Sequence, residues 1–324
     1  MLKSLNTPMC LADAMAYFAD QDNAIRFLAE LRWPDGVQCP RCGAGDPGWL
    51  ASRRIWKCKG KACRKQFSIK VGTIFEDSPL GLDKWLPALW MLANSKNGIS
   101  SYEMGRALGV TQKTAWFMLG RIRAAMGAAS FEKFEGEVEI DESFLGGKFK
   151  NMHLAKRKRL GKGQGARNTK VGVFGVLERP RGKHGVSRVR TTVVDDTSGS
   201  AILKRMESTV KPGTWVYSDE EQAFGVLRNR YVRETIHHAR EYVRGRVHTN
   251  GIENFWSLLK RTIKGTYVAV DPFHVTRYLD EQAFRFNHRR ASDGDRFVTL
   301  IDSLLGKRLT WNDLTGANLA VSTT

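Results

Sequence analysis

Two pairs of cysteines constrain the fold of the first part of this chain. Cys39 and Cys42 form a C-x2-C pair, Cys58 and Cys63 form a C-x4-C pair, and fifteen residues separate the pairs. Zinc takes four soft ligands in a tetrahedron, and two tight turns that each present two thiolates supply them at little cost in chain entropy. Two disulfides or buried free thiols are the alternatives, but the paired spacing and an expected cytoplasmic location favour a zinc ribbon with one structural Zn2+. Cys10 lies outside this set and is expected to be an ordinary thiol.

Two helices separated by a short turn are predicted over residues 98–126, after the ribbon. The pattern breaks at Gly109, and Thr111 is a suitable N-cap for the second helix. This pattern is typical of a helix-turn-helix, whose second helix would present Gln112 and Lys113 to a DNA groove. Many helical hairpins with a glycine turn bind nothing, so a purely structural role stays open.

The charge balance makes double-stranded DNA the leading candidate partner. The chain has 52 Lys and Arg against 33 Asp and Glu, a net charge of +19 and a pI near 9.9. A generally basic protein without a nucleic acid partner is the alternative. Residues 147–170 contain nine basic residues and no acid, and such a run is expected to be ordered by phosphates. The candidate DNA contacts in this run are Lys148, Lys150, Lys156, Arg157, Lys158 and Arg159.

The composition is that of a soluble globular protein rather than a membrane protein. The chain is 42% hydrophobic and 26% charged. Its longest strongly apolar stretch, residues 85–93, is far shorter than the roughly 20 residues that a bilayer crossing needs. No targeting segment is evident at the N-terminus. We therefore expect a bacterial cytoplasmic protein, associated with the nucleoid and without a membrane partner.

After residue 130 the pattern changes to strands followed by helices, which predicts an α/β fold with a mixed sheet flanked by helices. The expected strands are 137–147, 170–178, 188–196, 214–224 and 231–238. Two of these strands carry paired acids, which begin at Asp141 and Asp219. Carboxylates at the ends of neighbouring strands, joined by a third from a packed helix, can hold two hard divalent cations. The cations would reverse the repulsion between these acids and DNA phosphates.

The segment 248–265 is predicted to be an amphipathic helix whose polar stripe begins with Glu253. Its apolar residues recur at helical spacing, and the remaining charges are Lys260, Arg261 and Lys264. A solvated face with ordinary Glu-to-Lys pairs is the alternative to a functional one.

Three core motifs together resemble a known family. "EIDESFLGGK", "YSDEEQAF" and "HTNGIENFWSLLKR", preceded by the ribbon and the helix-turn-helix, resemble the ISXO-type DDE transposases of bacterial insertion sequences. The resemblance covers roughly residues 30–305 and implies a ribonuclease H-like core. It implies that Asp141, Asp219 and Glu253 hold Mg2+ or Mn2+, as two ions, and that Lys260 is the basic residue seven positions after Glu253.

The third ligand has a rival, because members of the family place Asn at that position and Asn254 follows Glu253 directly. Helix geometry favours Glu253, which lies about 20° around the axis from Lys260, whereas Asn254 lies about 120° away. A carboxylate also binds a hard cation better than an amide does. On the same helix, Lys260 would meet a DNA phosphate or terminal nucleotide, and Arg261 and Lys264 would hold the backbone.

Two further residues are weaker candidates. Glu139 shares a strand face with Asp141 and could be an extra ligand, although a rim carboxylate is the commoner outcome. His248 could orient water or phosphate, although a loop histidine bonded to the backbone is equally expected.

These observations predict a transposase that binds terminal inverted repeats and catalyses DNA cleavage and strand transfer as a dimer or higher oligomer on DNA. The alternatives are a catalytically silent repressor or domesticated descendant, and a metal-dependent nuclease or resolvase. The expected domains are an N-terminal helical segment (1–34), a zinc ribbon (35–75), a helix-turn-helix region (76–130), a ribonuclease H-like catalytic domain (131–305) and a C-terminal tail (306–324).

Overall fold

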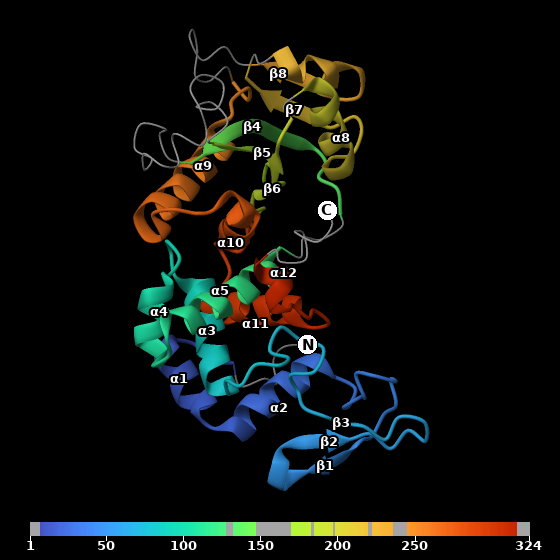
Figure 1. Ribbon diagram of the computed structural model, residues 1–324. Helices are drawn as coiled ribbons and strands as arrows, with labels where there is room; N and C mark the ends of the chain where they lie inside the picture. Colours follow the sequence, from blue (N-terminus) through green and yellow to red (C-terminus); the bar gives the residue numbers. More distant parts are fainter. Residues whose placement is uncertain are drawn as a thin grey trace, which may run out of the picture. The chain divides into compact units, whose positions relative to one another are not determined.

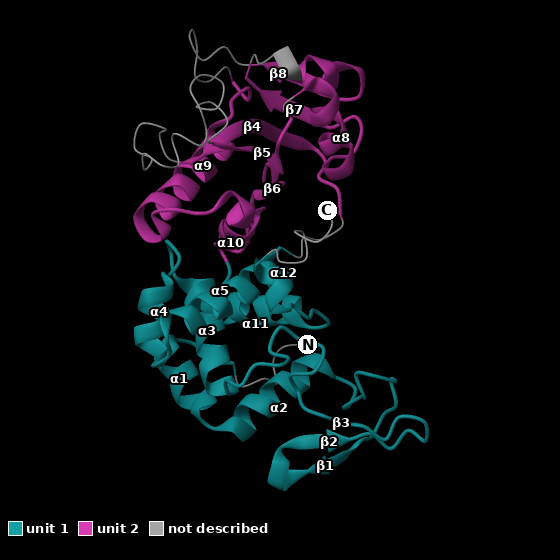
Figure 2. Ribbon diagram, in the orientation of Figure 1, with its two compact units in different colours: residues 1–128, 291–324 teal, residues 129–290 magenta. Residues whose placement is uncertain are grey.

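The computed structural model describes residues 7–127, 132–146, 170–182, 185–196, 198–219, 222–235 and 245–315. The chain divides into two compact units (Figure 2). Unit 1 comprises residues 1–128 together with 291–324, and unit 2 comprises residues 129–290. Unit 2 is therefore inserted, in sequence, between the two parts of unit 1.

Unit 1 begins with two helices and a small antiparallel sheet (Figure 1). The helices are α1 (Leu11–Ala19) and α2 (Gln21–Arg32). The sheet has the order β1-β2-β3, formed by β1 (Gly48–Leu50), β2 (Ile55–Lys57) and β3 (Gln66–Phe67), with the 3-10 turn η1 (Ala51–Arg53) between the first two strands. The Trp56 ring stacks on Phe67 at a centroid distance of 5.8 Å and contacts Trp49 at 4.7 Å.

The rest of unit 1 is helical and includes residues from both ends of the chain. Its helices are α3 (Leu82–Asn94), α4 (Ser101–Leu108), α5 (Gln112–Met126), α11 (Asp293–Leu304) and α12 (Trp311–Thr315). Phe297 of α11 joins an aromatic core with Phe18, Phe27 and Trp90, at centroid distances of 5.8, 6.0 and 5.1 Å. The helices on either side of unit 2 thus share one core.

The predicted break between α4 and α5 is confirmed. Gly109 ends α4 in the left-handed conformation, with φ of 65°, and its N–H bonds to Gly105. Thr111 caps α5 by accepting a hydrogen bond from the backbone N–H of Thr114. A Cβ on Gly105 would lie 3.0 Å from the carbonyl oxygen of Val110, so glycine there allows the tight turn.

Unit 2 contains a five-stranded mixed sheet in the order β6-β5-β4-β7-β8. Its strands are β4 (Glu137–Leu145), β5 (Val171–Glu178), β6 (Arg188–Val194), β7 (Trp215–Ser218) and β8 (Val232–Thr235). The pairs β4 with β5 and β5 with β6 are antiparallel, whereas β4 with β7 and β7 with β8 are parallel. Residues 214–224 were expected to be one strand, but β7 ends at Ser218 and a 3-10 helix, η3 (Gln222–Asn229), follows.

Helices cover both faces of this sheet (Figure 1). On one face, Val138 and Ile140 pack with residues of α8 (Gly199–Thr209) and η3. On the other face, Leu145 and Val173 pack with α9 (Asn250–Thr262) and α10 (Val275–Asn287). A π-helical turn, η4 (Ile263–Tyr267), and a 3-10 turn, η5 (Pro272–His274), connect α9 to α10. The predicted mixed sheet flanked by helices is confirmed, and no helix in the described part of the chain combines the length and apolarity needed to span a membrane.

Candidate catalytic site and zinc centre

Asp141 lies in the middle of β4, on the face that α9 covers. Its partner across the ladder is Gly175 of β5, and opposed residues of an antiparallel pair point to the same face. The indole N–H of Trp256 donates a 2.9 Å hydrogen bond to Asp141 Oδ2. A Cβ on Gly175 would lie 2.6 Å from Trp256 Cζ2 and 2.9 Å from Ile252 Cδ1. Glycine at 175 therefore gives the Trp256 ring room to lie against the sheet and reach Asp141.

The ionisation of Asp141 reports on its acidic neighbours. Burial, together with the charges of Asp219 and Glu253, raises the pKa of Asp141, and the net value is about 6. The backbone N–H of Glu142, 2.8 Å from Asp141 Oδ1, and the Trp256 indole lower the pKa. The three acids singled out in the sequence therefore lie close enough to interact electrostatically.

Asp219 directly follows β7, which is the parallel neighbour of β4. Arg233 of β8 secures this strand end. Its Nε donates to Ser218 Oγ and its Nη2 to the carbonyl oxygen of Asp219, both at 2.9 Å. The first two acids are thus carried by adjacent strands.

Glu253 lies in the first turn of α9 and is exposed. Thr249 Oγ1 donates a 2.8 Å hydrogen bond to Glu253 Oε1, which restrains the carboxylate at the start of the helix. Asn254 and Lys260 are exposed as well. The apolar stripe of the predicted helix is confirmed, because Ile252, Phe255, Trp256 and Leu259 are buried against the sheet.

The donor set Asp141, Asp219 and Glu253 suits a hard divalent cation, which prefers carboxylate oxygens. A cation between them would offset the repulsion that helps to raise the pKa of Asp141. Among the described residues, only the four cysteines bring all their ligand atoms within 4.8 Å of one another. The three carboxylates therefore interact electrostatically, but their oxygen atoms lie farther apart than the four cysteine sulfur atoms do.

Cys39, Cys42, Cys58 and Cys63 form the predicted four-sulfur cluster. Burial raises the pKa of the Cys39 thiol, but hydrogen bonds from the backbone at Arg41 and Cys42 lower it. The net pKa of this thiol is about 7. The thiolate is the form that binds zinc. The Sγ atoms of Cys42 and Cys58 lie 3.5 Å apart, and those of Cys39 and Cys63 lie 3.9 Å apart. The spacing of the four sulfur atoms fits one structural Zn2+.

Glu139 differs from the rim carboxylate that was expected, because it is only 1% exposed. Its Oε1 accepts from Arg179 Nε at 2.8 Å, and its Oε2 accepts from the backbone N–H of Ile252 at 2.9 Å. The expectation failed because the start of α9 lies directly over this part of β4. Pattern alone does not identify the helix that covers a strand face.

His248 also contacts Arg179. The Arg179 Nη2 lies 3.0 Å from His248 Nδ1 and donates to the His248 carbonyl oxygen at 2.7 Å. An arginine only donates, so Nδ1 is the acceptor. Burial, followed by the charge of Arg179, lowers the pKa of His248, which favours the neutral ring. Arg179 is a residue that sequence reasoning missed, and its only sequence signal is a basic residue directly after a buried strand.

A cavity of about 620 Å³ lies beside Arg179, at the end of the sheet where β4 begins. Glu137, Arg179, Arg246 and His248 contribute to its lining. Basic side chains in this lining are paired with acids, since Arg246 forms an ion pair with Glu137 at 2.5 Å.

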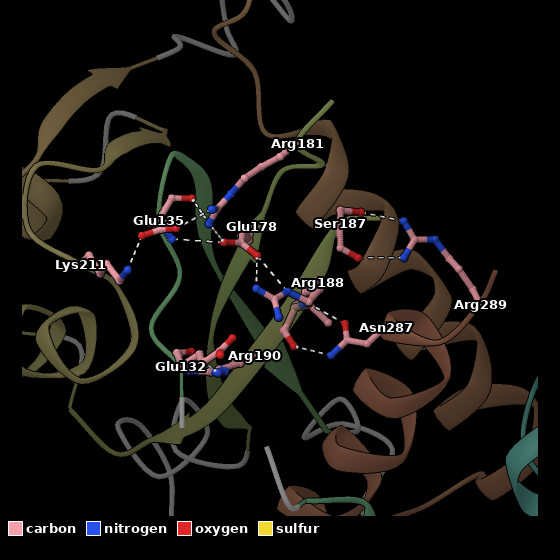
Figure 3. A network of polar contacts seen from close by, with 11 residues as sticks. Glu132, Glu135, Glu178, Arg181, Ser187, Arg188, Arg190, Lys211, Asn287 and Arg289 are labelled. Carbon is pink, nitrogen blue, oxygen red and sulfur yellow. Dashed lines mark hydrogen bonds and ion pairs between the residues drawn. The ribbon is translucent and has the colours of Figure 1, made fainter. Parts of the chain in front are cut away.

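A polar cluster next to this end of the sheet holds the β5–β6 hairpin (Figure 3). The buried Glu178 accepts from Arg181 at 2.6 Å and from Arg188 at 2.7 Å. Asn287 of α10 exchanges two hydrogen bonds with the backbone of Val189, at 2.7 and 3.1 Å (Figure 3). These basic groups are engaged in securing the hairpin.

The candidate DNA contacts differ in how available they are. Lys113 is exposed, whereas Gln112 is half-buried and its Nε2 donates to Ser101 Oγ at 2.9 Å. From Ala115 onward most of α5 is buried, and its Phe117 contacts Trp311 of α12 at 5.4 Å. The first turn of α5 is therefore its open part.

On α9 and the turn that follows it, Lys260, Arg261 and Lys264 are exposed. The other candidate contacts, Lys148, Lys150, Lys156, Arg157, Lys158 and Arg159, lie outside the described residues.

Comparison with known proteins gives matches over both units. The ISXO2-like transposase domain matches residues 133–287, and the transposase zinc-ribbon domain matches residues 19–66. A protein of the transposable element ISH50 from Halobacterium salinarum is 28% identical over 307 residues, covering 89% of this chain and 98% of the relative. A transposase-like protein from Haemophilus influenzae is 29% identical over 102 residues, covering 31% of this chain and 82% of the relative.

Proposed function

The chain belongs to the ISXO2-like transposases, and from this premise we propose that it binds the ends of its mobile element and catalyses metal-dependent DNA cleavage and strand transfer. One observation carries the proposal: Asp141, Asp219 and Glu253, from three different elements, interact electrostatically in a chain of net charge +19. Such a group of acids would repel DNA unless it held cations.

In this proposal, Asp141, Asp219 and Glu253 hold two Mg2+ or Mn2+ ions. When bound, such ions activate an attacking oxygen and stabilise the leaving oxygen of a phosphodiester displacement. Water first adds to phosphorus as the 3′-oxygen leaves, which frees a 3′-hydroxyl. That hydroxyl then attacks a target phosphodiester, so one P–O bond breaks as another forms.

The chain's own side chains orient these acids. Trp256 holds one oxygen of Asp141, and Thr249 holds one oxygen of Glu253. Glu253 is favoured over Asn254 as third ligand because a carboxylate binds a hard cation better than an amide does, and because Glu253 lies about 20° around the helix axis from Lys260. The exposed Lys260 would receive a phosphate or the terminal nucleotide, with Arg261 and Lys264 on the adjoining backbone.

The DNA ends are assigned to unit 1 in this proposal. The exposed Lys113, with Gln112 beside it, would enter a groove from the first turn of α5. The zinc ribbon would contact the DNA backbone. Pairing two element ends requires two active sites, so a dimer or higher oligomer on DNA follows.

Strand transfer with a pre-cleaved oligonucleotide that carries the element's own end tests the proposal. Wild type, Glu253→Gln and Asn254→Ala are compared in Mg2+ and in Mn2+, with binding of the same DNA measured in parallel. Joining by wild type and Asn254→Ala but not by Glu253→Gln would establish both the reaction and the third ligand. Tight binding without joining would support a repressor, and cutting without joining would support a nuclease.

A further inference from the structure

We propose that Arg179 is a positioning residue that, with Glu139, fixes the spacing of the three elements that carry Asp141, Asp219 and Glu253. The inference rests on the proposed function, because it assigns these acids to one metal site. It concerns residues that do not touch the metal or the DNA.

Arg179 contacts β4 through two acids. Its Nε donates to Glu139 Oε1 at 2.8 Å, and its Nη1 lies 3.4 Å from Glu137 Oε2. Its own backbone N–H bonds to the carbonyl oxygen of Glu137 at 2.9 Å. Only 11% of the Arg179 side chain and 2% of the Glu139 side chain are exposed, so the ion pair between these two residues is largely buried.

The same guanidinium contacts the other two elements. Its carbon lies 4.0 Å from the ring centroid of Tyr217, which stands in β7 two residues before Asp219. Its Nη1 donates to the carbonyl oxygen of Arg246 at 2.7 Å, and its Nη2 to that of His248, also at 2.7 Å. Residues 246 and 248 lead directly into α9. One side chain therefore contacts β4, β7 and the segment that leads into α9.

Glu139 completes the connection between β4 and α9. It stands two residues before Asp141 on the same strand face, and it accepts the backbone N–H of Ile252, which directly precedes Glu253. A Cβ on Gly251 would lie 2.8 Å from Glu139 Oε2, so glycine at 251 allows the helix to approach this closely. The neighbours of two proposed ligands are thus joined by a single hydrogen bond.

The ion pair between Glu139 and Arg179 does more than stabilise the fold. Replacing a buried ion pair by apolar residues of similar volume is often neutral for stability, so the charges are not needed merely to hold the sheet and helix together. The charged pair fixes the position of α9 along β4, because its hydrogen bonds are directional, whereas an apolar pair would permit α9 to slide along the strand. Both oxygens of Glu139 are already engaged by Arg179 and Ile252, which assigns Glu139 to positioning rather than to metal binding.

The test compares three variants with wild type: Arg179→Met, Glu139→Gln and the double variant Glu139→Met/Arg179→Met. The double variant removes both charges together, and Glu137 keeps Arg246 as its partner, so the double variant is expected to fold even where a single variant does not. Arg230→Met is the matched control, because Arg230 forms an exposed ion pair with Glu207 in the same unit. Joining of pre-cleaved DNA, Mn2+ binding by calorimetry and the melting temperature are measured for each protein.

We expect each variant to join DNA roughly 100-fold more slowly at saturating DNA, since misplacement by about 1 Å has this effect. We also expect weaker Mn2+ binding, and the double variant should be no slower than the worse single variant because the two residues act as one unit. Arg230→Met should match wild type. A merely structural role would lower the melting temperature and leave joining and Mn2+ binding unchanged in the folded protein.

Two results would overturn the inference while the proposed function stands. In the first, wild type and the folded double variant join at the same rate and bind Mn2+ equally. In the second, Arg179→Met retains joining while Glu139→Gln loses it, which would make Glu139 a metal ligand. If wild type itself neither joins DNA nor binds Mn2+, the proposed function fails and this inference fails with it.

Discussion

Gly175→Ala tests the contact on which the placement of Asp141 depends. Gly175 has no positive φ, so alanine is compatible with its backbone. Any loss of stability therefore comes from the added methyl group. That methyl would lie 2.6 and 2.8 Å from two carbons of Trp256 and 2.9 Å from Ile252 Cδ1. All three atoms belong to buried side chains of α9 that pack against the sheet, so neither side chain can move freely.

The change in the free energy of unfolding caused by Gly175→Ala follows from two opposing effects. Overpacking of a core costs about 1–3 kcal/mol, and the reduced freedom of the unfolded chain returns about 0.4–1 kcal/mol. The net loss of roughly 1–2 kcal/mol should lower the melting temperature of unit 2 by roughly 2–8 °C. Differential scanning calorimetry measures it directly.

Gly225→Ala is the matched control, because no atom lies within 4 Å of the Cβ it would add. It should leave the melting temperature unchanged or raise it slightly. Trp256→Phe separates packing from hydrogen bonding, since phenylalanine keeps an aromatic ring but cannot donate to Asp141. Joining should fall in both Gly175→Ala and Trp256→Phe. A Gly175→Ala protein that melts like wild type would refute the reasoning.

Three further predictions use other parts of the molecule. Cys42→Ser should release zinc, measured by a colorimetric chelator, and should leave the thermal unfolding of unit 2 unchanged; retained zinc would contradict the four-cysteine site. Since burial raises the pKa of Asp141 from 3.8 to about 6, the folded metal-free protein retains a proton that the unfolded chain has lost between these values, so stability from this group should fall as pH rises through that window. Asp141→Asn should lack this part of the pH dependence in denaturant titrations, and equal profiles would count against it. Glu281→Gln should cost about 3–5 kcal/mol in the same titrations, because it leaves the buried Arg285 without its counter-charge; a loss below about 1 kcal/mol would show that the pair is solvated.

The sequence predicted those features that depend on local rules. The cysteine spacing identified the sulfur cluster, and the turn chemistry of Gly109 and Thr111 located the break between two helices. Helical periodicity identified the buried and exposed faces of α9, with Glu253 on the exposed face. These features need no knowledge of distant contacts.

What could not be predicted depends on which segments meet in space. Strand alternation placed Glu139 on one face of β4 but did not identify the helix above it, so its burial was missed. Arg179 has no periodic neighbours that would reveal its role, because all its partners are distant in sequence. Gln112 looked like a free recognition residue, but Ser101 from the preceding helix engages it.

The insertion of unit 2 between two parts of unit 1 has a consequence for synthesis on the ribosome. All the described strands of unit 2 are complete once residue 235 has been made, and α10 ends at Asn287. Unit 1 begins first but still lacks α11, whose Phe297 closes the aromatic core around Phe18 and Phe27. Unit 2 can therefore reach its folded state while the core of unit 1 is still incomplete. A ribosome that stops after Arg290 would release a chain with a complete unit 2 sheet and an unfinished core in unit 1, so the fold of unit 1 depends on synthesis of nearly the whole chain.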